Sequence, residues 1–164
     1  MSSDRGIEVA RTDGSTGDFV NLDRDRIALA VQQPWAELIV RGLKTIEVRS
    51  TSVRVRGTIY IYASRRLSDL PDAAVAAERH DLNVESLPTG VIVGTANLTE
   101  CRAASPDDAD AACVSPAILD GRMAWCFTDS VKYIEPLQVR FSPYGIWFYP
   151  FRRRSYGESN SMKR

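Results

Sequence analysis

The chain has 164 residues, of which 44% are hydrophobic and 26% are charged, as is typical of a soluble globular protein of about one domain. This composition excludes a largely disordered chain, a collagen-like repeat and a disulfide-rich scaffold, because apolar residues are plentiful and glycine, proline and cysteine are few. No apolar run reaches the roughly 20 residues that cross a bilayer, and residues 1–14 lack the apolar stretch of a secretory signal. We therefore expect a cytoplasmic protein that does not enter a membrane.

The net charge is zero, but the charges are unevenly distributed along the chain. Residues 1–25 carry six acids and three bases, whereas residues 41–66 carry seven bases and one acid, and residues 151–164 carry five bases and one acid. Two basic stretches in a neutral protein can form a phosphate-binding surface. The simpler alternative is that they are solvated surface charges.

The first half of the chain predicts a tail, three strands and a short helix. Residues 1–25 are rich in Ser, Asp, Gly and Thr and predict a flexible N-terminal tail. Residues 27–31 predict a strand, and Pro34 is suited to the first turn of a helix that Gly42 ends. The alternating residues 44–49 predict a second strand, and the β-branched and aromatic residues 58–64 predict the strongest one.

The second half predicts one more helix and several consecutive strands. Residues 68–82 predict the helix, and residues 102–121 predict a loop. Strands are predicted at residues 89–98, 124–128, 133–141 and 145–149. Because these strands follow one another without helices between them, we predict an α+β fold, a mixed barrel with two or more helices packed around it. The domain spans residues 26–151, followed by a basic C-terminal tail over residues 152–164.

Metal and nucleophile patterns are absent from the sequence. Cys101, Cys113 and Cys126 are widely spaced without a CxxC pair, and His80 is the only histidine. There is no phosphate-binding loop, dinucleotide fingerprint or nucleophile elbow. We therefore predict no metal site and no cofactor.

The most informative segment is QQPWAELIVRGLKTIEVRS, residues 32–50. In a strand, side chains alternate between the two faces, so Glu47 and Arg49 lie on the face opposite Ile46 and Val48. Lys44 can join Glu47 only if it lies in the turn after the helix, before the strand begins. Such a lysine could bind phosphate or transfer a proton. On spacing alone, a solvated Glu–Arg pair beside an exposed lysine is the simpler interpretation.

Residues 42–49, GLKTIEVR, resemble the GxKxxExR signature of the ASCH domain family, a branch of the PUA-like superfamily. The preceding QQPWAELIV resembles the first helix of that family, and a weaker resemblance continues to about residue 150. The resemblance implies a small PUA-like mixed β-barrel with helices packed around a cleft. It also implies that Lys44, Glu47 and Arg49 line that cleft, and that the ligand is RNA, a nucleotide or a modified nucleoside.

We therefore expect a monomeric RNA- or nucleotide-binding domain without a cofactor. Lys44 and Arg49 would neutralise phosphate, and Glu47 would orient Lys44 or accept a hydrogen bond from a base amino group. Gln33 could contact a base edge, and Ser64 with Arg65 could lie at the mouth of the cleft, although a capping role for Gln33 and a plain surface position for the other two are the alternatives.

Two other functions remain open. The activities of the resembled family include RNA cleavage and removal of an acetyl group from acetylcytidine, so Lys44 and Glu47 could instead be the proton-transfer pair of a small hydrolase, a ribonuclease or a modified-nucleoside amidohydrolase. The deacetylating branch carries a threonine where this chain has Glu47. The third possibility is an interaction module whose cleft binds no nucleic acid.

Overall fold

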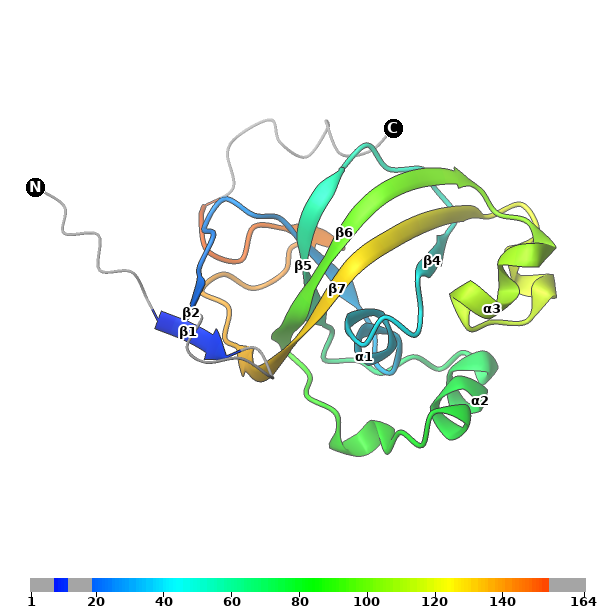
Figure 1. Ribbon diagram of the computed structural model, residues 1–164, viewed down its shortest axis with the longest axis horizontal. Helices are drawn as coiled ribbons and strands as arrows, with labels where there is room; N and C mark the ends of the chain where they lie inside the picture. Colours follow the sequence, from blue (N-terminus) through cyan, green and yellow to red (C-terminus); the bar gives the residue numbers. More distant parts are fainter. Residues whose placement is uncertain (1–7, 12–18, 154–164) are drawn as a thin grey trace, which may run out of the picture.

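The computed structural model describes residues 8–11 and 19–153, and its centre is a six-stranded mixed sheet (Figure 1). The strand order is β4-β7-β6-β5-β3-β8, and β3 pairs with β5 in parallel while the other pairs are antiparallel. The strands are β3 (Ala28–Val31), β4 (Ile46–Arg49), β5 (Gly57–Ala63), β6 (Val91–Ala103), β7 (Met123–Leu137) and β8 (Trp147–Phe148). The long strands β6 and β7 curl over helix α1 (Trp35–Val40), so the sheet forms a half-barrel with a helix inside it.

Helix α1 is the centre of the main hydrophobic core. All six of its residues are buried, and it ends as the sequence predicts, with Gly42 in the left-handed region at φ 72°. Ile59 and Ile61 of β5 pack in the core around the helix, whereas Tyr60 and Tyr62 lie in a second core on the opposite face of the sheet. The strand predicted over residues 58–64 is therefore confirmed, and its two faces contribute to different cores.

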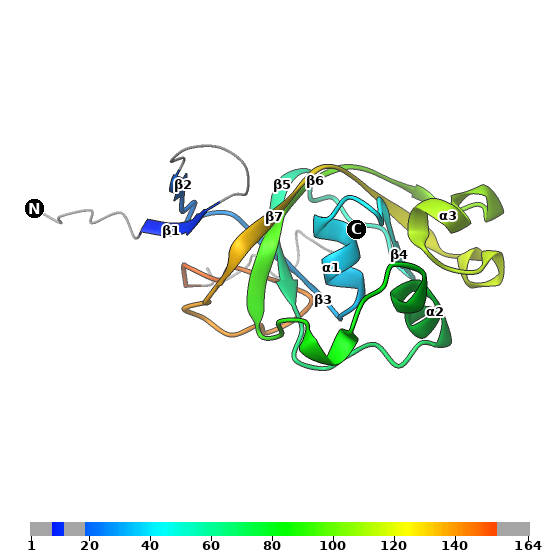
Figure 2. The same ribbon diagram turned by 60° about the horizontal axis from the view of Figure 1, so that its bottom comes forward.

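The remaining helices are short and lie outside the sheet (Figure 2). They are α2 (Pro71–Arg79), α3 (Ala109–Ala112) and the 3-10 helices η1 (Val84–Ser86), η2 (Pro106–Asp108) and η3 (Pro116–Leu119). The segment predicted as a loop over residues 102–121 is thus largely ordered by η2, α3 and η3. The α+β class is confirmed.

Two strands differ from their predicted extents. The sequence predicts separate strands at residues 124–128 and 133–141, but β7 is one strand that covers the first and continues into the second as far as Leu137, with an offset in its pairing to β6. Asp129 lies within β7 in the left-handed region at φ 51°, which marks a local irregularity between the two predicted strands. β6 likewise continues five residues beyond its predicted end at Leu98, to Ala103.

Part of the predicted N-terminal tail forms strands. β1 (Glu8–Arg11) and β2 (Phe19–Asn21) pair antiparallel, and β1 lies against β7. Leu22 packs against the second core, and Asp25 lies 3.5 Å from the Nε atom of Arg152. Residues 1–7, 12–18 and 154–164 lie outside the described residues, so the tail predictions there stay predictions.

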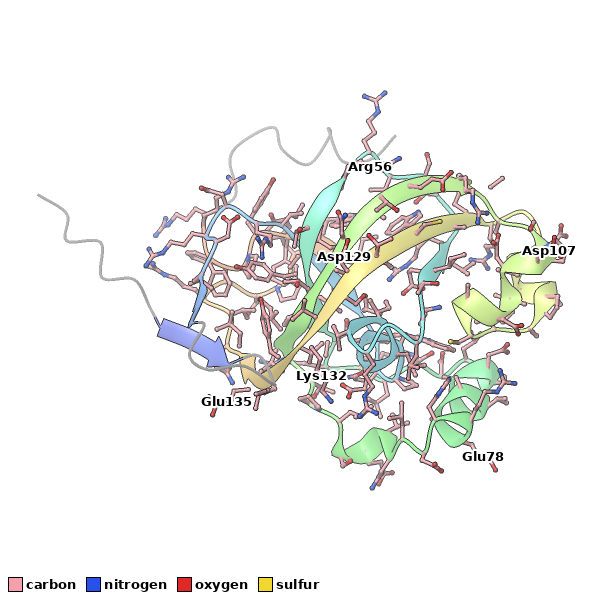
Figure 3. All side chains as sticks on the ribbon, viewed as in Figure 1. Arg56, Glu78, Asp107, Asp129, Lys132 and Glu135 are labelled. Carbon is pink, nitrogen blue, oxygen red and sulfur yellow. The ribbon has the colours of Figure 1, made fainter. Side chains whose placement is uncertain are left out.

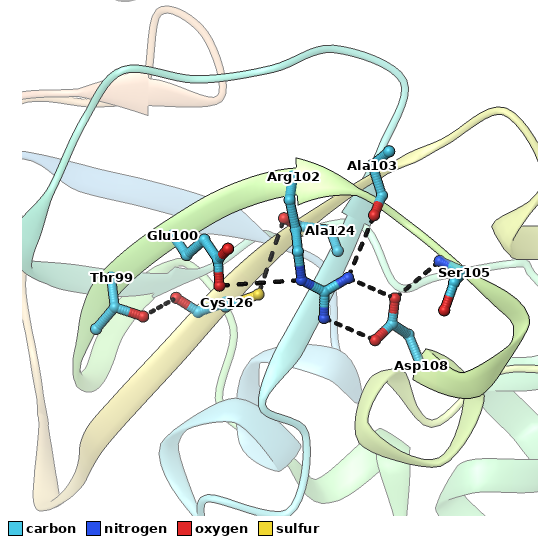
Figure 4. Close-up of polar contacts among 8 residues, drawn as sticks. All are labelled: Thr99, Glu100, Arg102, Ala103, Ser105, Asp108, Ala124 and Cys126. Atoms are coloured by element: carbon cyan, nitrogen blue, oxygen red, sulfur yellow. Dashed lines mark hydrogen bonds and ion pairs between the residues drawn. The ribbon is translucent and has the colours of Figure 1, made fainter.

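The outer end of β6 is attached to η2 by a carboxylate clamp (Figure 4). The guanidinium of Arg102 donates two hydrogen bonds of 2.8 Å to the two carboxylate oxygens of Asp108, and the backbone N–H of Ser105 donates a third of 2.8 Å. These donors lower the pKa of Asp108 to about 2. They therefore stabilise the fold while the carboxylate is ionised.

We expect Asp108→Asn to lower the free energy of unfolding at pH 7 by about 1–2 kcal/mol, allowing for solvent screening of the half-exposed Arg102. The pKa is depressed in the folded state. The clamp therefore contributes fully to stability at pH values above about 3.8, the pKa of this carboxyl in the unfolded chain, and the contribution is lost as the pH falls toward 2. Urea unfolding at pH 7 and near pH 2 measures this, with the exposed Asp107→Asn as control (Figure 3). An equal deficit at both pH values would contradict the clamp.

Candidate ligand-binding cleft

A cleft of about 850 Å³ lies where the two edges of the half-barrel approach each other without pairing. One wall is the edge strand β4, and the other is β3 with the segment that leads into β8. Its polar and charged lining residues are Gln32, Lys44, Glu47, Arg49, Ser64, Arg65, Ser68, Asp69, Arg122 and Ser142. The opening results from the incomplete closure of the sheet.

Lys44 lies at the bottom of the cleft with 1% of its surface exposed. Its backbone N–H donates to the Leu38 carbonyl at 3.0 Å, which places it in the turn after α1, ahead of the first residue of β4. Its ammonium donates to the carbonyl of Ala112 and lies 4.8 Å from the ring centroid of Trp35. Burial lowers the pKa of Lys44, and the nearby Glu47 carboxylate opposes that shift.

Glu47 and Arg49 lie side by side on β4, as the alternation predicts. The Oε1 atom of Glu47 accepts a hydrogen bond of 3.0 Å from the N–H of Val48. Its Oε2 atom lies 3.8 Å from Arg49 and is buried without a hydrogen-bond partner. The guanidinium of Arg49 is 5.6 Å from the ring centroid of Trp125 and contacts the Ala30 carbonyl of β3 at 3.4 Å. Arg49 thus reaches across the cleft from the edge strand β4 to β3, the strand next to the other edge strand β8.

The predicted residues therefore converge, with one exception. Lys44, Glu47, Arg49, Ser64 and Arg65 all line the cleft.

Gln33 does not line the cleft, because it is fully buried elsewhere. Its side chain donates to the Pro88 carbonyl at 3.0 Å and accepts from the backbone N–H of Glu37 at 2.9 Å, so both ends of its amide are used to hold α1. This matches the capping alternative. Gln32 is the glutamine that faces the cleft.

Sequence reasoning missed Arg122, which lines the cleft from the turn before β7. It follows a segment without a strong pattern, and only the fold brings it to the cleft that Arg65 also lines. Both arginines are exposed, and in the described part of the chain neither guanidinium forms a hydrogen bond or an ion pair. Trp35 of α1 is mostly buried but also lines the cleft, where its Nε1–H donates to Ser68 at 3.1 Å.

The other basic residues of the 41–66 stretch point elsewhere. Arg41 binds the buried carboxylate of Glu37 at 2.7 Å, and Lys132 of β7 binds the same oxygen. Arg56 lies just before β5 on the outside of the molecule, where its guanidinium donates to the carbonyls of Val53 and Val55 at 2.9 and 2.8 Å. Lys132 lies on the part of β7 close to α1 (Figure 3). Arg54 is exposed and does not line the cleft. The stretch as a whole is therefore not one phosphate-binding face.

Within residues 8–11 and 19–153, no three His, Cys, Asp or Glu side chains gather as a metal site would require. None of the helices in that part of the chain has the length and apolar character needed to span a membrane.

Comparison with known proteins gives a family model, curated relatives and solved structures. The ASCH domain model matches residues 29–138. Activating signal cointegrator 1 from Homo sapiens is 32% identical over 80 residues, and its counterpart from Mus musculus is 31% identical. Each match covers 44% of this chain and only 14% of the relative.

Among solved structures, ASCH from Zymomonas mobilis is similar with a TM-score of 0.52 and 19% identity, over 77% of this chain and 88% of that one. A point mutant of the same protein gives a TM-score of 0.50 at 18% identity, over 77% of this chain and 90% of that one.

Proposed function

Because the chain belongs to the ASCH domain family, and shares its α+β PUA-like fold, we propose that it recognises RNA or a nucleotide in the cleft between the edges of its half-barrel. One observation carries this proposal: Lys44, Glu47 and Arg49 of the GxKxxExR motif line the same cleft as Arg65 and Arg122, two arginines that have no ion-pair partner among the described residues. Such a cleft offers cations for phosphate and a carboxylate for a hydrogen-bond donor.

The charge balance of the cleft suits an anionic ligand. Its four cations are opposed by the carboxylates of Glu47 and Asp69, and Asp69 already pairs with Arg66 at 3.4 Å. Arg65 and Arg122 are exposed at the rim, where a phosphate can approach without losing all of its hydration. The deeper Lys44 and Arg49 lie among aromatic rings, beside the space that a base would occupy. The phosphate therefore belongs at the rim and the base on the floor.

We expect Arg65→Ala and Arg122→Ala each to weaken binding of a short single-stranded RNA and to flatten its salt dependence. Each phosphate contact on a single strand contributes about 0.7 to the slope of log affinity against log salt, so each variant should lose about that much. Fluorescence anisotropy at several salt concentrations measures both quantities. Arg56→Ala is the matched control, because this exposed arginine lies outside the cleft.

Two results would contradict the proposal. One is the absence of binding even at low salt. The other is a loss of affinity and slope in Arg56→Ala equal to that in the two cleft variants.

A hydrolase in the same cleft is the second candidate, and the lowered pKa of the buried Lys44 favours it, because a neutral amine can accept a proton. No ion pair within 4.0 Å joins Lys44 to Glu47 among the described residues, so proton transfer between them needs a bound ligand or water. Mass spectrometry of total RNA and a panel of modified nucleosides tests this candidate. A product formed by the wild type and not by Lys44→Met would support it.

A further inference from the structure

We propose that the carboxylate of Glu47 recognises the amino group of a nucleobase, so that the cleft prefers cytosine and adenine to uracil and guanine. This inference rests on the proposed function, because it requires a ligand that carries a base. It adds a specificity-determining residue and a class of bases to that function.

The unused acceptor is the first observation. Glu47 has 7% of its surface exposed and lines the cleft, and its Oε1 accepts a hydrogen bond from the Val48 N–H at 3.0 Å. Within residues 8–11 and 19–153, Oε2 accepts no hydrogen bond. An ionised carboxylate is an acceptor only, with about four positions for hydrogen bonds on its two oxygens. A buried acceptor without a partner is costly, so a ligand that donates an N–H gains more here than at the surface. The terminal torsion of glutamate is soft, so either oxygen can turn toward that donor.

The second observation is the position of the cations, which indicates where the phosphate and sugar of a ligand would lie. The unpaired cations Arg65 and Arg122 are at the rim, and Glu47 is on the floor. A nucleotide held at the rim by its phosphate points the part of the base farthest from the sugar toward Glu47. That part is position 4 of a pyrimidine or position 6 of a purine. It carries an amino group in cytosine and adenine and a carbonyl oxygen in uracil and guanine.

The third observation is the neighbour of the acceptor. The Arg49 guanidinium lies 3.8 Å from Oε2 and makes one long contact of 3.4 Å, to the Ala30 carbonyl. It therefore has N–H groups left to donate. An acceptor beside a donor complements the edges of cytosine and adenine, where the amino group lies beside a ring nitrogen that accepts. A carbonyl oxygen at the same position would instead face the carboxylate, and two acceptors repel each other.

The experiment compares short single-stranded RNAs in which one nucleotide carries a base and its neighbours are abasic. The five probes carry cytosine, adenine, uracil, guanine or N4,N4-dimethylcytosine, which has no N–H to donate. We expect the cytosine and adenine probes to bind about tenfold or more tightly than the other three, because a hydrogen bond to a buried charged acceptor is lost in the latter. Anisotropy or calorimetry at fixed salt gives the ratios.

Glu47→Gln is the diagnostic variant, because it keeps the size of the side chain and offers both a donor and an acceptor. We expect it to reduce the cytosine-to-uracil ratio to less than about threefold, because the amide N–H of the variant can donate to the uracil carbonyl oxygen that the carboxylate repels, so the uracil probe binds the variant at least as tightly as it binds the wild type. That retained affinity, with an unchanged melting curve, shows that the cleft is intact. The control is Glu135→Gln, an exposed carboxylate of β7 outside the cleft (Figure 3), which should keep the wild-type ratio.

Equal binding of all five probes, with affinity still dependent on Arg65, would overturn this inference and leave the proposed function standing. The same holds for a cytosine preference that Glu47→Gln does not change. If no probe and no longer RNA binds at low salt, the proposed function fails as well.

Discussion

Replacing Gly94 with alanine is expected to lower the free energy of unfolding by about 3 kcal/mol, the upper part of the range for overpacked sites. A Cβ atom at this position would lie 2.0 Å from the Val131 carbonyl oxygen of β7 and 2.9 Å from Cγ1 of Val40. The first distance is to backbone, so the two long strands would have to separate where their pairing is already offset. Urea or thermal unfolding measures the change.

Gly145→Ala is the matched control for this effect. The nearest atom to its added Cβ would be the Trp147 carbonyl oxygen at 3.8 Å, an ordinary contact. We expect its stability to stay within about 0.5 kcal/mol of the wild type. If Gly94→Ala were as mild as this control, the close approach of β6, β7 and α1 described above would be wrong.

Lys44→Met is expected to lower the affinity for the ligand about tenfold or more without destabilising the fold. The wild-type ammonium is buried at a cost in free energy, as the lowered pKa of Lys44 reflects. An apolar side chain of similar length removes that cost, although the Ala112 carbonyl loses its donor and the Glu47 carboxylate keeps only Arg49 as a nearby cation among the described residues. We expect the free energy of unfolding to rise or to change by less than about 1 kcal/mol. Anisotropy and urea unfolding of the same preparation give both values.

Lys132→Met should give the opposite pattern. Lys132 binds the buried carboxylate of Glu37, and removing it leaves that charge with Arg41 alone. We expect a loss of about 1–2 kcal/mol in stability and unchanged RNA affinity, because Lys132 does not line the cleft. If Lys44→Met lowers the free energy of unfolding as much as Lys132→Met, Lys44 is a structural residue and the prediction is wrong.

Local patterns in the sequence predicted the elements that carry the motif. The period-two alternation placed Glu47 and Arg49 on one face of β4, and the helix–glycine order placed Lys44 in the turn before that strand. Both placements depend only on residues that are close together in the chain. The resemblance to the ASCH signature then supplied what spacing alone did not, namely that these three side chains face a cleft.

The walls of the cleft could not be predicted in the same way, because they come from distant segments. Arg122 lies beside the cleft because it precedes β7, which pairs with β4, and the opening exists because the edge strands β4 and β8 do not pair. Gln33 and Gln32 are adjacent in sequence, yet only the latter faces the cleft. Their difference depends on the Pro88 carbonyl, 55 residues away from Gln33, so no local pattern separates them.

The most direct test of a ligand site in the cleft is a two-dimensional ¹H–¹⁵N NMR titration with the cytosine-bearing RNA probe. We expect the largest shifts at the backbone N–H of Val48, which donates to Glu47, and at the indole N–H of Trp35, which donates to Ser68 inside the cleft. Both should be lost in Lys44→Met. Shifts confined to the exposed residues around Arg54 and Arg56, with Val48 and Trp35 unmoved, would contradict the account.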